Sequence, residues 1–518
     1  MYAIMKLRLT FKTQVATLLL ITVATGGAWG QGSQPTPSTR AMQLPLSANQ
    51  HSEVLVQQSA NPPAGASVNT VNTRIQVQGA YAGSVADPNI PADVLELTLA
   101  DAVRRGLQYN LGRVGTDNRF QQAEAQRLAA RSSLLPNISA SASENAAKIS
   151  LEAEGLTSAT FGSANAFPAT AGPFHYYDIQ GSLQQSVMDF TAIHNYRSAR
   201  QSAAAAGLDA RQAREEVVLA VTGTYLQLMA ISALVKEQRV EVQYAEASYK
   251  QSKVQADAGT KAPIDANRSQ VELQTAEQRL RSQLADLKKQ KNSLARLIGL
   301  QLGLEFSITE KLEGPPREVA PVEESVRRAW AERQDLKSAE AQLRAAEEAR
   351  KAAGAQRLPS ITVNGNYGLQ GTNPDQGNGV FQASASISVP IYSGGRIGAD
   401  KTEADAVVAQ RRAELSNQRG AVELDVRNAY IDLDVASEQV ATAESNKKLA
   451  LSILQQSQDR FAVGVADSVE VVNSQETLAA ADHDYVSSLF SLNLARVALA
   501  HAMGEAEKDL PELFKGSK

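Results

Sequence analysis

Apolar side chains recur every three or four positions along two long parts of the chain, which is the spacing of amphipathic helices. In the first part they stand at Val217, Val221, Tyr225, Leu228 and Val235, and in the second at Val422, Val426, Tyr430 and Leu433. Helices rarely continue through proline, and no proline occurs between Pro173 and Pro263 or between Pro390 and Pro511. The sequence therefore predicts long helices over 191–257, 263–299, 396–462 and 467–503, with turns at Gly259 and Gly464. A helix of roughly 100 Å, at about 1.5 Å per residue, must lie against neighbours in a coiled bundle.

Other parts of the chain alternate apolar and polar residues, which is the period of β-strands. The apolar positions are Ile361, Val363, Gly365, Tyr367 and Leu369, followed by Phe381, Ala383, Ala385, Ile387 and Val389. This predicts strands over 360–370 and 380–391 joined by the loop 371–379, with counterparts at about 137–143 and 174–188. Strands of about ten residues with one polar face suit an outer-membrane barrel that has a wet interior. The alternative is a water-exposed sheet packed on helices.

The chain contains the same unit twice. Residues 103–138 recur 223 positions later, for example Leu135-Pro136 as Leu358-Pro359, and residues 259–299 recur 205 positions later, for example Ser269-Gln270 as Ser474-Gln475. The two repeats span 94–304 and 321–504, each with a helix, two strands and two long helices, and 305–320 links them. The first repeat carries an insertion between Ser139 and Gln180. Self-similarity of this kind indicates one supersecondary unit used twice.

Four strands per chain cannot close a membrane barrel, because the smallest ones need about eight. Open strand edges cannot face lipid, so several chains must share one barrel. Three copies would give 12 strands with cyclic symmetry, and we therefore expect a homotrimer. The predicted fold class is an α+β membrane protein whose four strands per chain contribute to a trimeric 12-stranded outer-membrane β-barrel, continued by long coiled helices.

The amino terminus predicts export. Lys6, Arg8 and Lys12 precede an apolar run from Val15 to Val23 and a small-residue end, which is the layout of a signal peptide over 1–30. Residues 31–93 are rich in Pro, Ser, Gln and Asn and are interpreted as a disordered tether, and 505–518 as a C-terminal tail. No later run approaches about 20 uninterrupted apolar residues, so no membrane-spanning helix is expected.

Composition excludes several kinds of chemistry and binding partner. The chain has no cysteine, so disulfides and thiol chemistry are excluded, and its net charge of -4 with no basic block argues against nucleic acid. The five histidines, His51, His175, His194, His483 and His501, lack the spacing of a metal site. No catalytic motif is present, so we predict neither an enzyme nor a cofactor.

From about Leu95 to Gly504 the chain resembles the TolC-like outer-membrane efflux proteins. The features that carry the resemblance are the segments 461–475 (FAVGVADSVEVVNSQ) and 258–265 (AGTKAPID), the Leu-Pro entry into each first strand, and the segment 389–395 (VPIYSGG). The resemblance implies a homotrimer in the outer-membrane lipid with a helical tunnel in the periplasm. It also implies a passive exit duct of a tripartite efflux or type I secretion system, supplied by an inner-membrane pump and a periplasmic adaptor (membrane fusion protein). A secreted or periplasmic trimeric helical scaffold or adhesin without transport is the alternative.

The resemblance also implies the functional positions. Glu470 falls where the family has an acidic ring at the periplasmic entrance, and Asp265 is its counterpart in the first repeat. Three carboxylates around one axis would attract cations. Alternatively, Asp467 and Glu470 form a capping box that opens the last long helix. The helix-turn tips that would contact the adaptor comprise Gly259, Thr260, Lys261, Gly464, Val465 and Asp467.

The entrance departs from the family pattern at three positions. The family closes the entrance with a Tyr and an Arg that bond to the carboxylate matching Asp265, but here those positions are Phe461 and Ala466. Neither side chain can donate that bond. Asn473 replaces a second entrance acid and is uncharged. Closure is therefore expected to use packing of Phe461, Val463 and Val465, or another contact such as one made by Lys261.

Overall fold

The computed structural model describes residues 54–59, 72–87, 95–153, 168–260, 262–308, 310, 320–373, 375–463, 465–466 and 468–508. The predicted signal peptide, much of the predicted tether, and Lys261, Gly464 and Asp467 lie outside these residues. The chain divides into residues 1–50 and 51–518, and everything described belongs to the second unit.

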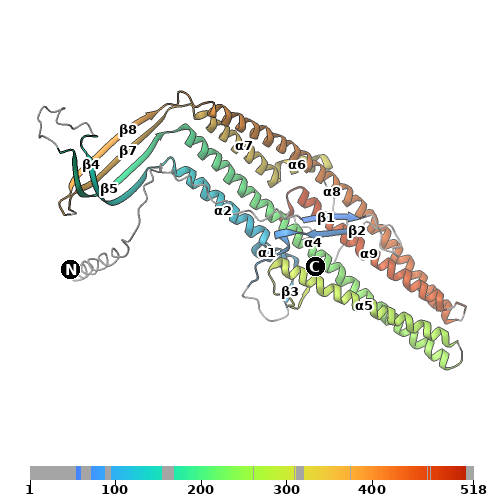
Figure 1. Cartoon of the computed structure of the whole chain (residues 1–518). Coiled ribbons are helices and arrows are strands. Elements are labelled where there is room, and N and C mark those ends of the chain that lie inside the picture. The colour runs from blue at the N-terminus through green and yellow to red at the C-terminus, as the bar shows by residue number, and fades with distance from the viewer. Residues whose placement is uncertain are drawn as a thin grey trace, which may run out of the picture. The chain divides into compact units, whose positions relative to one another are not determined.

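Four long helices dominate this unit, arranged as two antiparallel hairpins (Figure 1). The first hairpin is α4 (Phe190–Asp257) with α5 (Pro263–Ile298), and the second is α8 (Arg396–Ala462) with α9 (Ser468–Ala502). The cap of α4 is Asp189, whose carboxylate accepts the backbone N–H of Ala192 at 2.9 Å. At about 1.5 Å per residue, α4 and α8 are each roughly 100 Å long, so each separates the strands before it from the turn after it by that distance.

Each repeat opens with two shorter helices where the sequence predicted one. These are α1 (Leu99–Tyr109) with α2 (Leu111–Ser132), and α6 (Val322–Glu332) with α7 (Gln334–Ala355). The breaks fall at Asn110 and Arg333, 223 positions apart. The buried Asn110 amide donates to the carbonyl oxygens of Tyr81 and Leu297, and its Oδ1 accepts the N–H of Gly112. Tertiary partners therefore hold this break, which local periodicity does not show.

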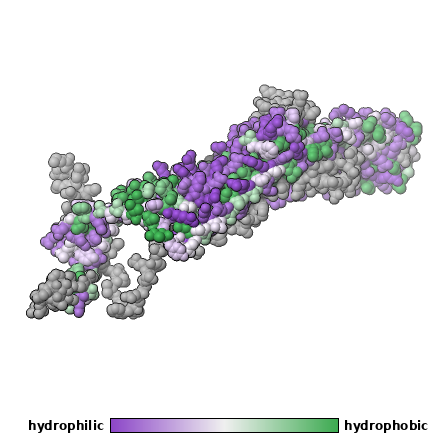
Figure 2. All heavy atoms as spheres, turned by 90° about the horizontal axis from the view of Figure 1, so that it is seen from above, coloured by the Kyte–Doolittle hydropathy of each residue, from purple (hydrophilic) through white to green (hydrophobic). Residues whose placement is uncertain are grey.

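A four-stranded antiparallel sheet joins the two repeats. Its order is β4 (Asn137–Ser150), β5 (Thr170–Met188), β7 (Ser360–Gly371) and β8 (Asn378–Ser388). Ile361 pairs with Ile387 and Tyr367 with Phe381, so the apolar residues of β7 and β8 share one face. On the other face Asn366 donates to Gln180 at 2.9 Å. Figure 2 shows hydrophobic surface over the part of the sheet next to the long helices.

Short strands outside this sheet correct two predictions. The disordered tether over 31–93 is wrong for 54–59 and 72–87, because β1 (Val54–Ser59) pairs with β2 (Asn72–Val77) and the short helix η1 (Gly79–Ala82) follows. Val54 is buried, and Ile75 packs against the same core. The 305–320 linker is likewise not wholly irregular, because β6 (Phe306–Ile308) pairs in parallel with β3 (Leu95–Leu97). The count of four strands thus holds for the large sheet alone.

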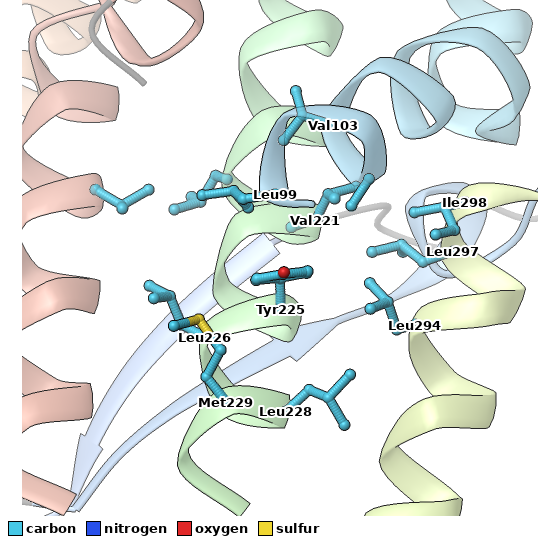
Figure 3. Close-up of a cluster of buried hydrophobic side chains, with 14 of the residues drawn as sticks. Leu99, Val103, Val221, Tyr225, Leu226, Leu228, Met229, Leu294, Leu297 and Ile298 are labelled. Carbon is cyan, nitrogen blue, oxygen red and sulfur yellow. The ribbon is translucent and has the colours of Figure 1, made fainter. Parts of the chain in front are cut away.

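The main core lies where α1, α5 and α9 meet the middle of α4 (Figure 3). Tyr225 of α4 is fully buried there, close to Val221 on the same helix and Leu294 of α5. By length and composition α4 could cross a membrane, in contrast to the expectation of no such helix, but 72% of its most apolar window is buried inside the fold. The apolar residues of this window pack in the core of the fold.

Candidate functional site

The two helix turns are spanned by equivalent backbone hydrogen bonds. In the first turn the N–H of Thr260 donates to the carbonyl oxygen of Gln255 at 2.9 Å, and Gly259 has a φ of +72°. In the second turn the N–H of Val465 donates to the carbonyl oxygen of Arg460, also at 2.9 Å. The two bonds join positions that differ by 205 residues. A bond of this span with a left-handed glycine is the Schellman closure of a helix end.

A buried serine pair lies just inside each turn. Ser269 donates to Ser252 at 3.1 Å in the first hairpin, and Ser457 and Ser474 lie 2.8 Å apart in the second. Small hydroxyl side chains let the two antiparallel helices approach closely while satisfying each other's polar atoms. The hairpins therefore reach their turns as tightly paired helices.

Each return helix begins with an acidic residue in its first turn, Asp265 in α5 and Glu470 in α9. A carboxylate there is stabilised by the positive end of the helix dipole. Arg268 lies 3.8 Å from Asp265 on the same helix. The carboxylate of Glu470 lies 3.2 Å from Nε of Arg460, which belongs to the last turn of α8. Each acid thus has a guanidinium neighbour.

The other predicted entrance residues lie around the same two turns. Glu470 and the exposed Asn473 border a shallow hollow between α8 and α9, together with Ile453, Ser457, Val469, Ser474 and Thr477. Phe461 is half-buried at the end of α8, whereas Val463 and Val465 are 75% and 70% exposed. Ala466 is half-buried, and its N–H donates to Arg460 at 3.2 Å.

The first turn is exposed, as Val463 and Val465 of the second turn are. Gly259 and Thr260 are both exposed, and a Cβ atom built on Gly259 would meet nothing within 4 Å. The predicted tip residues Lys261, Gly464 and Asp467 lie outside the described residues. The capping box between Asp467 and Glu470 therefore stays a prediction, although α9 does begin at Ser468, directly after Asp467.

Arg460, like Arg268, lies beside a predicted site residue and was not itself predicted from the sequence. A basic residue four positions before a turn glycine reads as an ordinary helix C-terminal cation. Its partner Glu470 is ten positions away, and only the turn geometry brings the two side chains together. The available signal was the opposite charge on the two sides of the predicted turn at Gly464.

Three of the five histidines lie in separate ion pairs. His175 lies 3.6 Å from Glu144, His194 2.8 Å from Glu348, and His501 3.2 Å from Glu216. His51 lies outside the described residues. In the part of the chain that the structure describes, no three side chains gather as metal ligands do.

Known proteins match this chain over both repeats. The outer membrane efflux protein family matches residues 117–300 and 326–505. The pyoverdine export outer membrane protein OpmQ of Pseudomonas aeruginosa is 25% identical over 403 residues, covering 74% of this chain and 80% of that protein.

Solved structures of outer membrane channels share the fold. The CmeC channel of Campylobacter jejuni superposes with a TM-score of 0.69 at 16% identity, covering 81% of this chain and 90% of that one. The open MtrE channel of Neisseria gonorrhoeae gives 0.65 at 16% identity, covering 88% and 95%. The family match, which extends over more than half of the sequence, confirms the predicted outer-membrane location and efflux role in preference to a scaffold or adhesin. This chain belongs to the outer membrane efflux protein family.

Proposed function

We propose that three copies of this chain form one exit duct, in which a 12-stranded barrel crosses the outer membrane and 12 long helices continue it into the periplasm. The observation that carries the proposal is the four-stranded sheet, whose outer strands β4 and β8 each pair on one side only within the part of the chain that the structure describes. Unpaired strand edges cannot face lipid, and three sheets joined edge to edge leave no edge open.

The two faces of the sheet support the same arrangement. Ile387 and Phe381 on the apolar face are 69% and 81% exposed in the single chain, which suits contact with acyl chains. The opposite face carries Ser139 and Ser182, whose hydroxyls lie 2.7 Å apart, and the Asn366–Gln180 pair. Hydroxyl and amide groups suit a water-filled lumen, so substrate would pass along this face.

The helix turns are the other end of the duct. They lie roughly 100 Å along α4 and α8 from the strands, and in the proposed trimer their six copies surround the periplasmic entrance. Glu470, Asp265, Asn473, Phe461 and Ala466 then belong to the entrance, and Gly259, Thr260 and Val465 to the rim that meets a periplasmic adaptor. The inner-membrane pump joined to that adaptor would choose the cargo, because the duct itself is passive.

Native mass spectrometry of the protein extracted in mild detergent tests the assembly. We expect the mass of three mature chains, together with discrete conductance steps after reconstitution into planar bilayers. A monomer that keeps its strand content by circular dichroism would overturn the shared barrel. A trimer that never conducts would overturn the duct while leaving the assembly intact.

A further inference from the structure

The acidic positions at the two helix turns are paired with arginines that come from different places in the two repeats. In the second repeat Arg460 lies 3.2 Å from Glu470 across the turn. In the first repeat Arg268 lies 3.8 Å from Asp265 along one helix. Position 205 before Arg460 is Gln255, and position 205 after Arg268 is Asn473. The arginine thus comes from the return helix in the first repeat and from the preceding helix in the second, and each pair joins one acid to one arginine.

The backbone holds the second pair in place. The carbonyl oxygen of Arg460 accepts the N–H groups of both Val465 and Ala466, at 2.9 and 3.2 Å. Glu470 is one of the first residues of α9, which starts at Ser468. Both side chains are partly open to solvent, at 57% and 37%. The pair is therefore fixed by its turn but faces water, where it acts on passing ions more than on stability.

We propose that Arg460 and Arg268 compensate Glu470 and Asp265, so that these two acid positions add little net charge to the entrance, which then admits anionic and zwitterionic cargo as well as cations. This inference rests on the proposed duct. Three bare carboxylates near one axis would produce a potential that excludes anions, because the fields of charges of like sign add along the axis. A guanidinium beside each carboxylate turns the charge into a dipole, whose field falls off faster with distance. The predicted cation-attracting ring of Glu470 is then present but masked.

Reversal potentials in planar bilayers under a KCl gradient test this directly. We expect the wild-type ratio of K⁺ to Cl⁻ permeability to lie near one. Arg460→Gln, which installs the residue of the equivalent position in the first repeat, should raise the ratio severalfold, and Arg268→Gln should act in the same direction. Glu470→Gln should shift the ratio below one, and the double variant Arg460→Gln with Glu470→Gln should return it toward the wild-type value.

Two control variants separate this effect from general changes in charge or folding. Arg460→Lys keeps the cation and should keep the wild-type ratio. Arg411→Gln removes an arginine that pairs with Glu414 on the same helix, far from the turn, and should leave the ratio unchanged. A wild-type duct that is already strongly cation-selective, with no further change in Arg460→Gln, would overturn the compensation. Absence of conductance in every variant would instead overturn the duct itself.

Discussion

The hydroxyl of Tyr430 donates to the carbonyl oxygen of Ala320 at 2.6 Å, and this bond repeats one made in the first half of the chain, where Tyr225 donates to Leu97 at 2.9 Å. The two tyrosines are 205 residues apart and the two carbonyls 223 apart, which are the offsets of the duplicated sequence. Each tyrosine therefore ties the middle of a long helix to the segment that leads into the first short helix of its repeat.

Tyr225 has a second hydrogen-bond partner besides Leu97. The hydroxyl of Tyr225 also lies within hydrogen-bond distance of the carboxylate of Glu310, so its one proton is shared between Leu97 and Glu310. The other oxygen of Glu310 accepts the N–H of Leu99 at the start of α1. Burial, and then Glu310, raise the pKa of Tyr225, so its hydroxyl stays protonated and remains a donor. We expect Tyr225→Phe to lower the free energy of unfolding by about 1–3 kcal/mol, because buried acceptors lose their donor.

Tyr430→Phe is the matched comparison. Tyr430 and Ala320 are only partly buried, so water can take the place of the tyrosine hydroxyl beside Ala320 and beside the buried Ser325, whose hydroxyl lies 2.7 Å from it. We expect a cost of about 1 kcal/mol or less. Thermal unfolding in detergent, followed by circular dichroism, would measure both variants. Equal melting temperatures for the two would contradict a special role for the Glu310 contact.

Sequence pattern alone predicted the parts of the fold that local chemistry determines. Apolar spacing, absent prolines and the turn glycine place α4 at Phe190–Asp257 against an expected 191–257, and α8 at Arg396–Ala462, the expected range. The break at Asn110 was missed because its cause is hydrogen bonding to Tyr81 and Leu297, which are distant in sequence. The hairpin of β1 and β2 was missed because strands of six residues give a weak periodic signal inside a polar segment.

The candidate site, like the fold, could be predicted from the sequence only in part. The acids Asp265 and Glu470 could be read from helix-start patterns, because first-turn carboxylates have a local electrostatic cause. The contact of Arg460 with Glu470 could not be read in this way, because it depends on how two antiparallel helices pass each other. Comparison of the two repeats supplies part of what the local pattern lacks. Where equivalent positions carry different residue types, the role of that position differs between the repeats.

Adjacent residues of β8 offer a test of which sheet face meets lipid. Ala385 pairs with Val363 on the apolar face, and Ser384 pairs with Asn364 on the polar face. We expect Ala385→Lys to destabilise the membrane-inserted protein by about 2–4 kcal/mol, the cost of a lysine near the bilayer midplane. Ser384→Lys should be tolerated because its side chain would reach water.

Urea titration of the protein reconstituted in vesicles would give both values. The two variants differ by one position in the same strand, so strand propensity and added charge are matched. Similar destabilisation by both lysines would contradict the assignment of the faces.

The exposed turn glycine gives a test of adaptor contact. Gly259 and Gly303 both have positive φ, at +72° and +85°, and a Cβ atom on either would meet nothing within 4 Å. Valine at either position therefore carries the same kind of backbone strain. Only Gly259 lies at a turn between long helices. We expect Gly259→Val to lower efflux-dependent drug resistance while Gly303→Val leaves it near the wild-type value, with equal amounts of assembled protein in the outer membrane. Equal resistance in both variants would count against the contact.

The ion pair between His501 of α9 and Glu216 of α4 makes stability depend on pH. The two side chains lie 3.2 Å apart, with Glu215 and Arg333 nearby. Burial disfavours the charged imidazole, but Glu216 overcomes this and raises the pKa of His501 above its ordinary value of 6.5. Because the pKa of His501 is higher in the folded protein than in the unfolded one, the stabilisation is fully present below the pKa of the unfolded state. It is lost as the pH rises through the pKa of the folded state.

We therefore expect the melting temperature of the protein to fall as pH rises from about 6 through the raised pKa of His501, as linkage requires. His501→Gln should flatten this part of the profile and should lower stability most on its acidic side, where the imidazolium is lost. His483→Gln, which alters an exposed histidine on the same helix, is the control and should keep the wild-type slope. Differential scanning fluorimetry in detergent at closely spaced pH values would give the three curves. If His501→Gln kept the wild-type slope, the pH dependence would belong to other groups, and the pair would have only a packing role between α4 and α9.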